Sequence, residues 1–166
     1  MPPDGPGPVL HIALLEPEIG PNAGSIGRLC LGIGARLHLV HPLGFQTDEK
    51  AVRRAGLDYW RHVDVVEHPD QAAFWAWAGD RRVHLFSARA ARPYTALAWR
   101  RGDVLLFGRE SVGLPPELLA RHPSWAIPLS GPIRSLNLAN AVSVVAFQAL
   151  QQVEPALFAD PGPGSD

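Results

Sequence analysis

The stretch SGPIRSLNLANAVSVVAFQAL, residues 130–150, begins with polar side chains and ends almost entirely apolar. From Val142 onward it is typical of a buried helix, because apolar residues occupy nearly every face. We expect one long helix near 137–153, with so much apolar surface that Val144 and Phe147 would lie near a partner subunit. The hydrogen-bonding residues around its beginning are Arg134, Ser135, Asn137 and Asn140. They either cap the helix and brace its loops, or bind a polar or anionic ligand at its N-terminus.

Short apolar runs alternate with helical ones along the rest of the chain. Strands are expected at 9–15, 36–41, 63–68, 82–88, 103–108 and 125–129. Helices are expected near 23–33, 48–56, 70–78 and 115–121, before the long one. This alternation predicts an α/β fold with a mostly parallel sheet and helices on both faces. Ligands of such sheets bind at the carboxyl ends of the strands, so the residues just after each strand are the candidates for chemistry.

The composition fits one globular domain, which we expect to span 9–154 between flexible, Pro/Gly-rich tails at 1–8 and 155–166. The formal net charge of the 166 residues is -1, so a contact with nucleic acid must be local rather than the work of a global basic field. The single cysteine, Cys30, excludes an intrachain disulfide and fits a reducing cytoplasm. Neither a signal peptide nor a membrane-spanning run is expected.

Two further segments follow predicted strands. The first, EPEIGPNAGSIGRLC at 16–30, contains turn-forming residues and a predicted N-cap, Asn22, for the helix that carries Arg28. The second, FGRESVGLPPELL at 107–119, places Glu110 in a turn. Taken alone, the first segment is more typical of a capped loop with a surface arginine than of a site, and Glu110 is typical of a solvated carboxylate.

The motifs of several other site classes are missing. GIGA at 32–35 lacks the third glycine of a dinucleotide fingerprint, and the sequence holds neither a P-loop nor a G-x-S-x-G elbow. His38 and His41 point to opposite faces of one strand, and we interpret them as structural. With no Cys/His cluster, no metal site is expected.

Together, three segments resemble the three motifs of the SPOUT methyltransferases of the TrmH-like branch. They are EPEIGPNAGSIGRLC (16–30), LLFGRESVGLP (105–115) and IPLSGPIRSLNLANAVSVVAFQA (127–149). A fourth, KAVRRAGLDYW (50–60), is similar to a segment of the small bacterial enzymes that 2′-O-methylate the wobble nucleotide of certain leucine tRNAs. The match departs at Gly20, Ser25 and Phe147, where the family often has proline, asparagine and tyrosine.

The resemblance implies a SPOUT fold with a C-terminal trefoil knot, a pocket for S-adenosylmethionine formed by the knot loops, and an obligate homodimer. The cofactor-binding residues that it implies are Phe86, Gly108, Glu110, Ile127, Leu129, Ser135, Leu136 and Asn140. The catalytic residues that it implies are Arg28, Glu110, Ser135 and Asn137. Backbone amides beside apolar side chains would suit adenine, which has apolar faces and hydrogen-bonding edges. For Asn140, a purely bracing role is the open alternative.

The implied reaction is an in-line displacement, in which a ribose 2′-oxygen attacks the sulfonium methyl group of the cofactor. The motifs offer no obvious base, and the proton acceptor stays open. An arginine is a poor base because it stays protonated, so we interpret Arg28 as a group that grips a phosphate and stabilises the developing alkoxide. Glu110 either orients groups near the sulfonium or braces its loop. The sulfonium is already a good leaving group, so the chemistry requires no metal.

Local arginines are the expected RNA contacts. The predicted substrate-binding residues are Asn22, Arg28, Arg53 and Arg54, with Arg61, Arg89, Arg92 and Arg109 as further candidates. The predicted function is 2′-O-methylation of the wobble nucleotide in the anticodon stem-loop of tRNA, with leucine tRNAs as the expected substrates. The alternatives are another tRNA position or rRNA, and a non-catalytic RNA- or nucleotide-binding protein on the same fold. The isoacceptor, the choice between cytidine and modified uridine, and the need for a prior base modification stay open.

Overall fold

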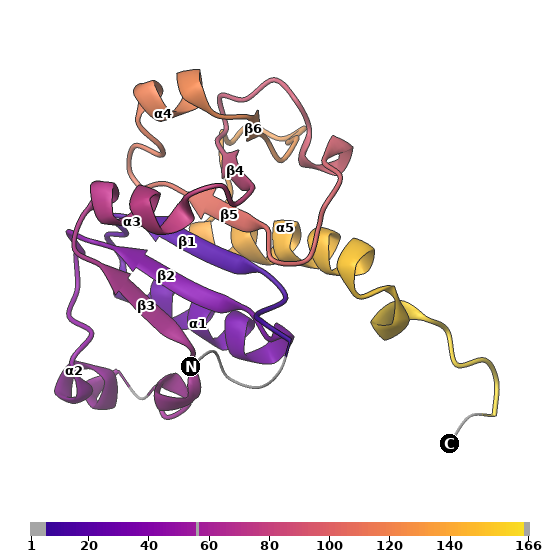
Figure 1. The fold of residues 1–166 in the computed structure, drawn as a ribbon, viewed down its shortest axis with the longest axis horizontal. Helices are drawn as coiled ribbons and strands as arrows, with labels where there is room; N and C mark the ends of the chain where they lie inside the picture. The colour runs from indigo at the N-terminus through magenta and orange to yellow at the C-terminus, as the bar shows by residue number, and fades with distance from the viewer. Residues whose placement is uncertain (1–5, 56, 165–166) are drawn as a thin grey trace.

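A parallel sheet organises the chain (Figure 1). The computed structural model describes residues 6–55 and 57–164. The strands are β1 (His11–Leu15), β2 (Arg36–Val40), β3 (Val65–His68), β4 (Val83–Phe86), β5 (Val104–Phe107) and β6 (Ser124–Trp125). They pair in the order β3-β2-β1-β5-β4-β6, and every pair is parallel. The central strand β1 is buried along its whole length, which explains its continuous apolar sequence. The predicted parallel sheet is confirmed.

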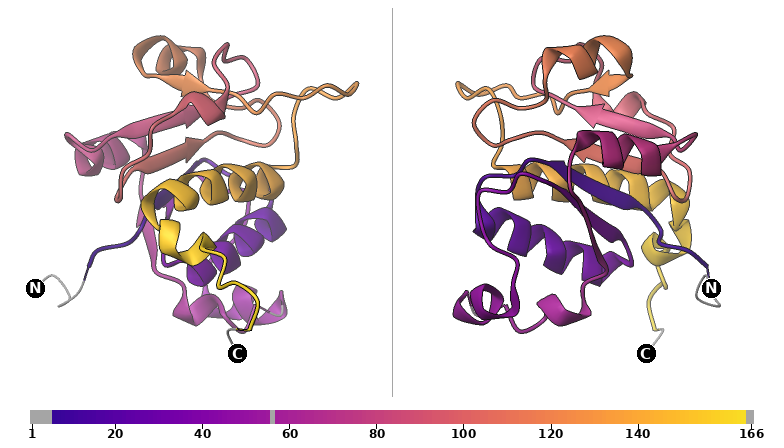
Figure 2. Two further views of the ribbon diagram at one scale, coloured as in Figure 1. Left: turned by 90° about the vertical axis from the view of Figure 1, so that its right-hand side faces the viewer. Right: turned by 60° about the vertical axis from the view of Figure 1, so that its left-hand side comes forward.

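Helices cover both faces of this sheet, as predicted (Figures 1 and 2). They are α1 (Gly20–Ile33), α2 (Glu49–Arg54), α3 (Gln71–Ala78), α4 (Pro116–Arg121) and α5 (Leu138–Val153). Ile26 of α1 and Val145 of α5 share one core with one face of the sheet. Phe74 of α3 and Leu118 of α4 share a second core with the other face. Among the described helices, none is long and apolar enough to cross a membrane.

The last strand and the tail differ from expectation. Of the strand predicted at 125–129, only Trp125 belongs to β6 (Ser124–Trp125), and Ala126 adds a single bridge to Pro93. Pro128 has no N–H to donate to a ladder, and the chain leaves the sheet before it. The segment between β6 and α5 projects from the body of the molecule (Figure 2). After α5 the predicted tail begins with a 3-10 helix, η3 (Pro155–Phe158). The trefoil knot stays a prediction of the resemblance.

Three histidines form a hydrogen-bonded row under α3. Nδ1 of His11 lies 2.9 Å from Nε2 of His38, and Nδ1 of His38 lies 2.9 Å from Nε2 of His68. The Trp77 ring packs on all three imidazoles. Burial, with smaller contributions from nearby positive charge, lowers the pKa of His11 to about 4 and that of His38 to about 2. The row is therefore neutral at pH 7, and each ring can donate from one nitrogen and accept at the other. His38 serves packing, as predicted.

The connection between β4 and β5 is tied to the end of α5 by one glutamine. The Trp99 backbone N–H donates to Oε1 of Gln152 (2.8 Å), and Nε2 of Gln152 donates to the Leu97 carbonyl (3.3 Å). Leu97 and Trp99 are buried in the same core as α5. One side chain thus satisfies two backbone groups of a segment that lies more than fifty residues earlier in the chain.

We expect Gln152→Ala to lower the free energy of unfolding by roughly 1–2 kcal/mol, because two hydrogen bonds to buried segments are lost. Urea denaturation at neutral pH measures the change. Gln151→Ala is the matched control, since Gln151 is exposed on the same turn. An equal loss in the two variants would mean that helix propensity, not the tie to Leu97 and Trp99, sets the effect.

Candidate active site

Glu110, in the loop after β5, holds the loop after β1. Its carboxylate accepts hydrogen bonds from the backbone N–H groups of Glu18 (2.8 Å) and Ile19 (3.1 Å). A longer bond of 3.4 Å comes from the side-chain amide of Asn22. A carboxylate is well placed there, because the N-terminus of α1 presents unpaired N–H groups and a positive dipole end. The first two motif segments therefore form one unit.

Asn22 and Asn137 join the third segment to this unit. Nδ2 of Asn137 donates to Oδ1 of Asn22 (3.1 Å), and Oδ1 of Asn137 accepts from the Asn140 backbone N–H (3.3 Å). Asn137 is therefore the N-cap of α5. The prediction that Asn22 caps α1 is wrong: the N-cap is Ile19, which makes no side-chain cap bond. The helix begins at Gly20, before the predicted start, so Asn22 lies inside the first turn, where it is buried and binds across to Asn137.

A second group of contacts locks the same two loops. Nε of Arg109 donates to Glu16 (3.0 Å), and Glu18 accepts from both the backbone N–H and the hydroxyl of Ser111. The Ser111 hydrogen bonds lower the pKa of Glu18. Arg109, a candidate RNA contact by sequence, is thus engaged in an ion pair with Glu16. Neither Glu16 nor Glu18 was predicted; the available signal was two alternate carboxylates directly after a strand.

Arg28 differs from these residues because its donors are not used within the site. It is exposed on α1, and its guanidinium carbon lies 5.7 Å from the ring centre of Tyr59. The Tyr59 hydroxyl in turn donates to the Gly24 carbonyl (2.9 Å). In residues 6–55 and 57–164, no other side chain forms a hydrogen bond or ion pair with Arg28. The cation–π contact orients the guanidinium and leaves its N–H groups available to an oxygen-rich ligand.

Two of the predicted cofactor-binding residues, Phe86 at the end of β4 and Gly108 after β5, have structural roles. The Phe86 ring packs in the core against Phe107 and Trp99, with centroids 4.9 and 6.0 Å away. Its ring therefore serves the core. Gly108 permits a close return of the chain, since a Cβ there would lie 2.2 Å from the backbone carbon of Gly113. Only glycine fits at this turn.

The loop after β6 carries the remaining predicted cofactor residues. Ile127, Leu129 and Leu136 are half-buried, whereas Ser135 and Asn140 are exposed. No backbone N–H of the described loop 127–136 donates to another backbone group. Free peptide groups beside half-buried apolar side chains meet the two needs of an adenosine, namely hydrogen bonds at its edges and apolar contact with its faces. The residues present fit S-adenosylmethionine.

Arg53 and Arg54 lie elsewhere, in the last turn of α2. The structure does not bring them to the group formed by Glu110, Asn22 and Asn137. Arg54 instead lines a pocket together with Gly20 and Gly24 of α1.

The parallel α/β sheet, with its three joined motif loops at the carboxyl edge, has the arrangement that the resemblance to the SPOUT methyltransferases implies. The chain belongs to the SpoU rRNA Methylase family, whose model matches residues 9–147.

Two relatives and two solved structures show which members of the family the chain is similar to. The chain is 42% identical over 148 residues to the tRNA (cytidine(34)-2′-O)-methyltransferase of Escherichia coli K12, covering 87% of this chain and 94% of that protein. It is 43% identical to the enzyme of the same name from Aeromonas hydrophila, covering 87% and 95%. A structure described as giving structural insights into the 2-OH methylation of C/U34 on tRNA is 49% identical, with a TM-score of 0.82 over 86% of this chain and 95% of that one. An AdoMet-bound rRNA methyltransferase from Sinorhizobium meliloti is 26% identical, with a TM-score of 0.75 over 86% and 56%.

Proposed function

We propose that the chain is an S-adenosylmethionine-dependent methyltransferase that modifies the ribose 2′-hydroxyl of nucleotide 34 of tRNA. The observation that carries the proposal is the joined group of motif loops. Glu110, Asn22 and Asn137 are hydrogen-bonded into one unit, while Arg28, on the same helix as Asn22, keeps its donors available. The names of the relatives supply the nucleotide and the tRNA. Because the substrate is tRNA, we expect the enzyme to act in the cytoplasm.

The side chains of this site divide into two roles. S-adenosylmethionine, when bound, supplies a methyl group activated by the sulfonium. Arg28 is the residue that we assign to the RNA: it grips a phosphate and stabilises negative charge at the 2′-oxygen. Glu110 and Asn137 are positioning residues, because their polar atoms hold other parts of the loops. Ser135 is exposed in the loop after β6 and available to either ligand.

Methylation of total tRNA by the purified protein, followed by nucleoside mapping, tests the proposal. The expected product is a 2′-O-methylated nucleotide at position 34, first of all in leucine tRNAs. A product in rRNA or at another tRNA position would assign the alternative substrate. If no methyl transfer occurs and calorimetry detects no heat with S-adenosylmethionine, a non-catalytic RNA-binding protein is the remaining class.

The exposed apolar residues of α5 support a homodimer. Val144 and Phe147 are 38% and 45% exposed in the single chain, and Leu31 of α1 is 42% exposed. We expect a dimer by sedimentation at micromolar concentration, and we expect Phe147→Glu to shift it toward monomer, because a charge buried in an apolar interface has no partner. Ala72→Glu, at an exposed position of α3 on the other face of the sheet, is the matched control. A monomeric native protein would contradict the prediction.

A further inference from the structure

We propose that the pocket between α1, α2 and residues 45–47 holds an unstacked nucleobase of the RNA, beside the ribose that Arg28 serves. The pocket has a volume of about 380 Å³, and neither Glu110 nor Asn22 nor Asn137 lines it. The proposal rests on the proposed function, since it names the part of the RNA that this second site receives.

Glycines of α1 create the room for this pocket. A Cβ on Gly20 would lie 3.3 Å from Cβ of Phe45, and one on Gly24 would lie 3.1 Å from Cδ1 of Leu57. Both glycines face the pocket because they are one helical turn apart. Larger residues at these positions would push Phe45 and Leu57 outward, so the glycines of the first motif serve this pocket as well as the loop before the helix.

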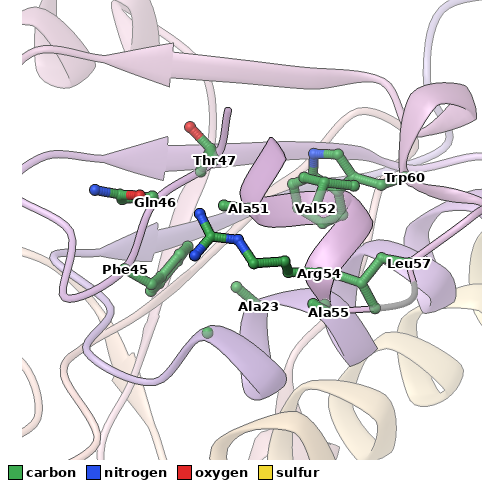
Figure 3. Close-up of a pocket in the computed structure, with 12 residues that line it drawn as sticks. Ala23, Phe45, Gln46, Thr47, Ala51, Val52, Arg54, Ala55, Leu57 and Trp60 are labelled. Atoms are coloured by element: carbon green, nitrogen blue, oxygen red, sulfur yellow. The ribbon is translucent and has the colours of Figure 1, made fainter. Parts of the chain in front are cut away.

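The chemistry of the walls suits a flat aromatic ring. Phe45 and Trp60 are the aromatic residues that line the pocket, and most of the other lining residues are small or aliphatic. The polar side chains among them are Gln46, Thr47 and Arg54. Figure 3 shows the Arg54 side chain extended along the pocket toward Phe45 and Gln46. A nucleobase has the matching pattern, because its faces stack on apolar and aromatic surfaces while its edges accept and donate hydrogen bonds.

The pocket lies close to Arg28, the residue that we assign to the ribose and its phosphate. Gly24 lines the pocket, and its carbonyl accepts the hydrogen bond of Tyr59, whose ring lies under Arg28. Arg28 lies one helical turn after Gly24 on α1, so it is a neighbour of the pocket. Arg54 is the charged residue among those that line the pocket, so positive charge at Arg28 and at Arg54 favours a phosphodiester chain. RNA-modifying enzymes gain sequence selectivity by receiving bases that have left the stack.

The test fills the pocket without adding charge. Ala51→Phe places a ring in the pocket from α2, and Ala72→Phe makes the same change at an exposed position of α3 as the control. The substrate is an anticodon stem-loop RNA, with an abasic residue placed in turn at each loop position. We expect Ala51→Phe to lower kcat/KM roughly five- to a hundredfold, the range for loss of one stacked base, while S-adenosylmethionine affinity, thermal unfolding and sedimentation stay as in the native protein.

The abasic series identifies the base. At one loop position, removal of the base should lower kcat/KM of the native protein by a similar factor, and Ala51→Phe should then cause no further loss. If the losses multiply at every position, or if Ala51→Phe reacts like the native protein, the pocket does not hold a base. A changed oligomeric state in Ala51→Phe alone would assign the pocket to the subunit contact and overturn the proposal.

Two further measurements keep the result decisive. Should Ala51→Phe fail to fold, Phe45→Leu removes an aromatic face while keeping an apolar side chain, and the same loss is expected. Should the native protein fail to methylate the unmodified stem-loop, the stem-loop cut from native tRNA, which carries its base modifications, replaces it, and failure on both RNAs would put the proposed function at fault. The affinity of each variant for the RNA, measured by fluorescence anisotropy, then still tests the pocket.

Discussion

Replacement of Arg28 by alanine should abolish most methyl transfer and leave cofactor affinity almost unchanged. The guanidinium is exposed, oriented by Tyr59 and without another partner in the described part of the chain. Loss of a phosphate contact and of charge stabilisation should cost roughly 3–4 kcal/mol, on the order of a hundred- to a thousandfold in the single-turnover rate. Arg28→Lys should restore little, because lysine keeps the charge but lacks the planar fork of donors.

Asn137→Ala is the contrasting variant. It removes the N-cap of α5 and the bond to Asn22, so it should weaken cofactor binding or destabilise the loop. Cofactor affinity by calorimetry and single-turnover rate separate the two variants, after sedimentation shows the same oligomeric state as the native protein. An equal loss of cofactor affinity in both would place Arg28 in the cofactor pocket and contradict its assignment to the RNA.

Acid should destabilise the folded protein by about 4 kcal/mol between pH 7 and pH 5, through the row of buried histidines. Burial lowers the pKa of His11 to about 4 and that of His38 to about 2, and it also lowers the pKa of His68. In the unfolded chain a histidine titrates near pH 6.5, so below that pH the unfolded state binds protons that the folded state does not. Stability is therefore complete above about pH 6.5 and falls as the pH drops, by roughly 2 kcal/mol at pH 5 for each of His11 and His38.

Urea denaturation at several pH values measures this loss. His38→Leu should make the pH dependence shallower, because it removes one of the buried groups and breaks the row. Phe74→Leu is the control, since Phe74 is buried in the same layer and contacts the His68 ring. It should lower stability equally at every pH. If His38→Leu and the native protein show the same dependence between pH 7 and pH 5, the histidine row is not its source.

The layers of the fold follow from local patterns, whereas the contacts of the site do not. Apolar runs and helical spacing predict the order of the six strands and five α-helices, because those patterns report burial of a segment in its own neighbourhood, but they make β6 too long and miss η3. They place Glu110 and the helix start that carries Asn22 at the carboxyl edge of the sheet. They do not reveal that the carboxylate of Glu110 binds residues 91 and 92 positions away, because no periodicity encodes such a pair.

The partners of two further residues, Asn22 and Gln152, could not be predicted from the sequence. Asn22 has the side chain of an N-cap, but α1 begins two residues earlier, at Gly20, and the amide of Asn22 binds Asn137 from inside the first turn. Gln152 was not predicted to have a role, and only the folded chain shows that it binds the backbone groups of Leu97 and Trp99.

The way in which Glu110 holds the first loop has a consequence for how freely that loop can evolve. At Ile19 the carboxylate binds the peptide N–H and not the side chain, and that side chain is 46% exposed. Nineteen of the amino acids carry the same backbone N–H, so substitution of the Ile19 side chain leaves the hydrogen bond to Glu110 in place. Proline alone lacks the donor and is the one residue that a lineage cannot adopt there without losing the bond.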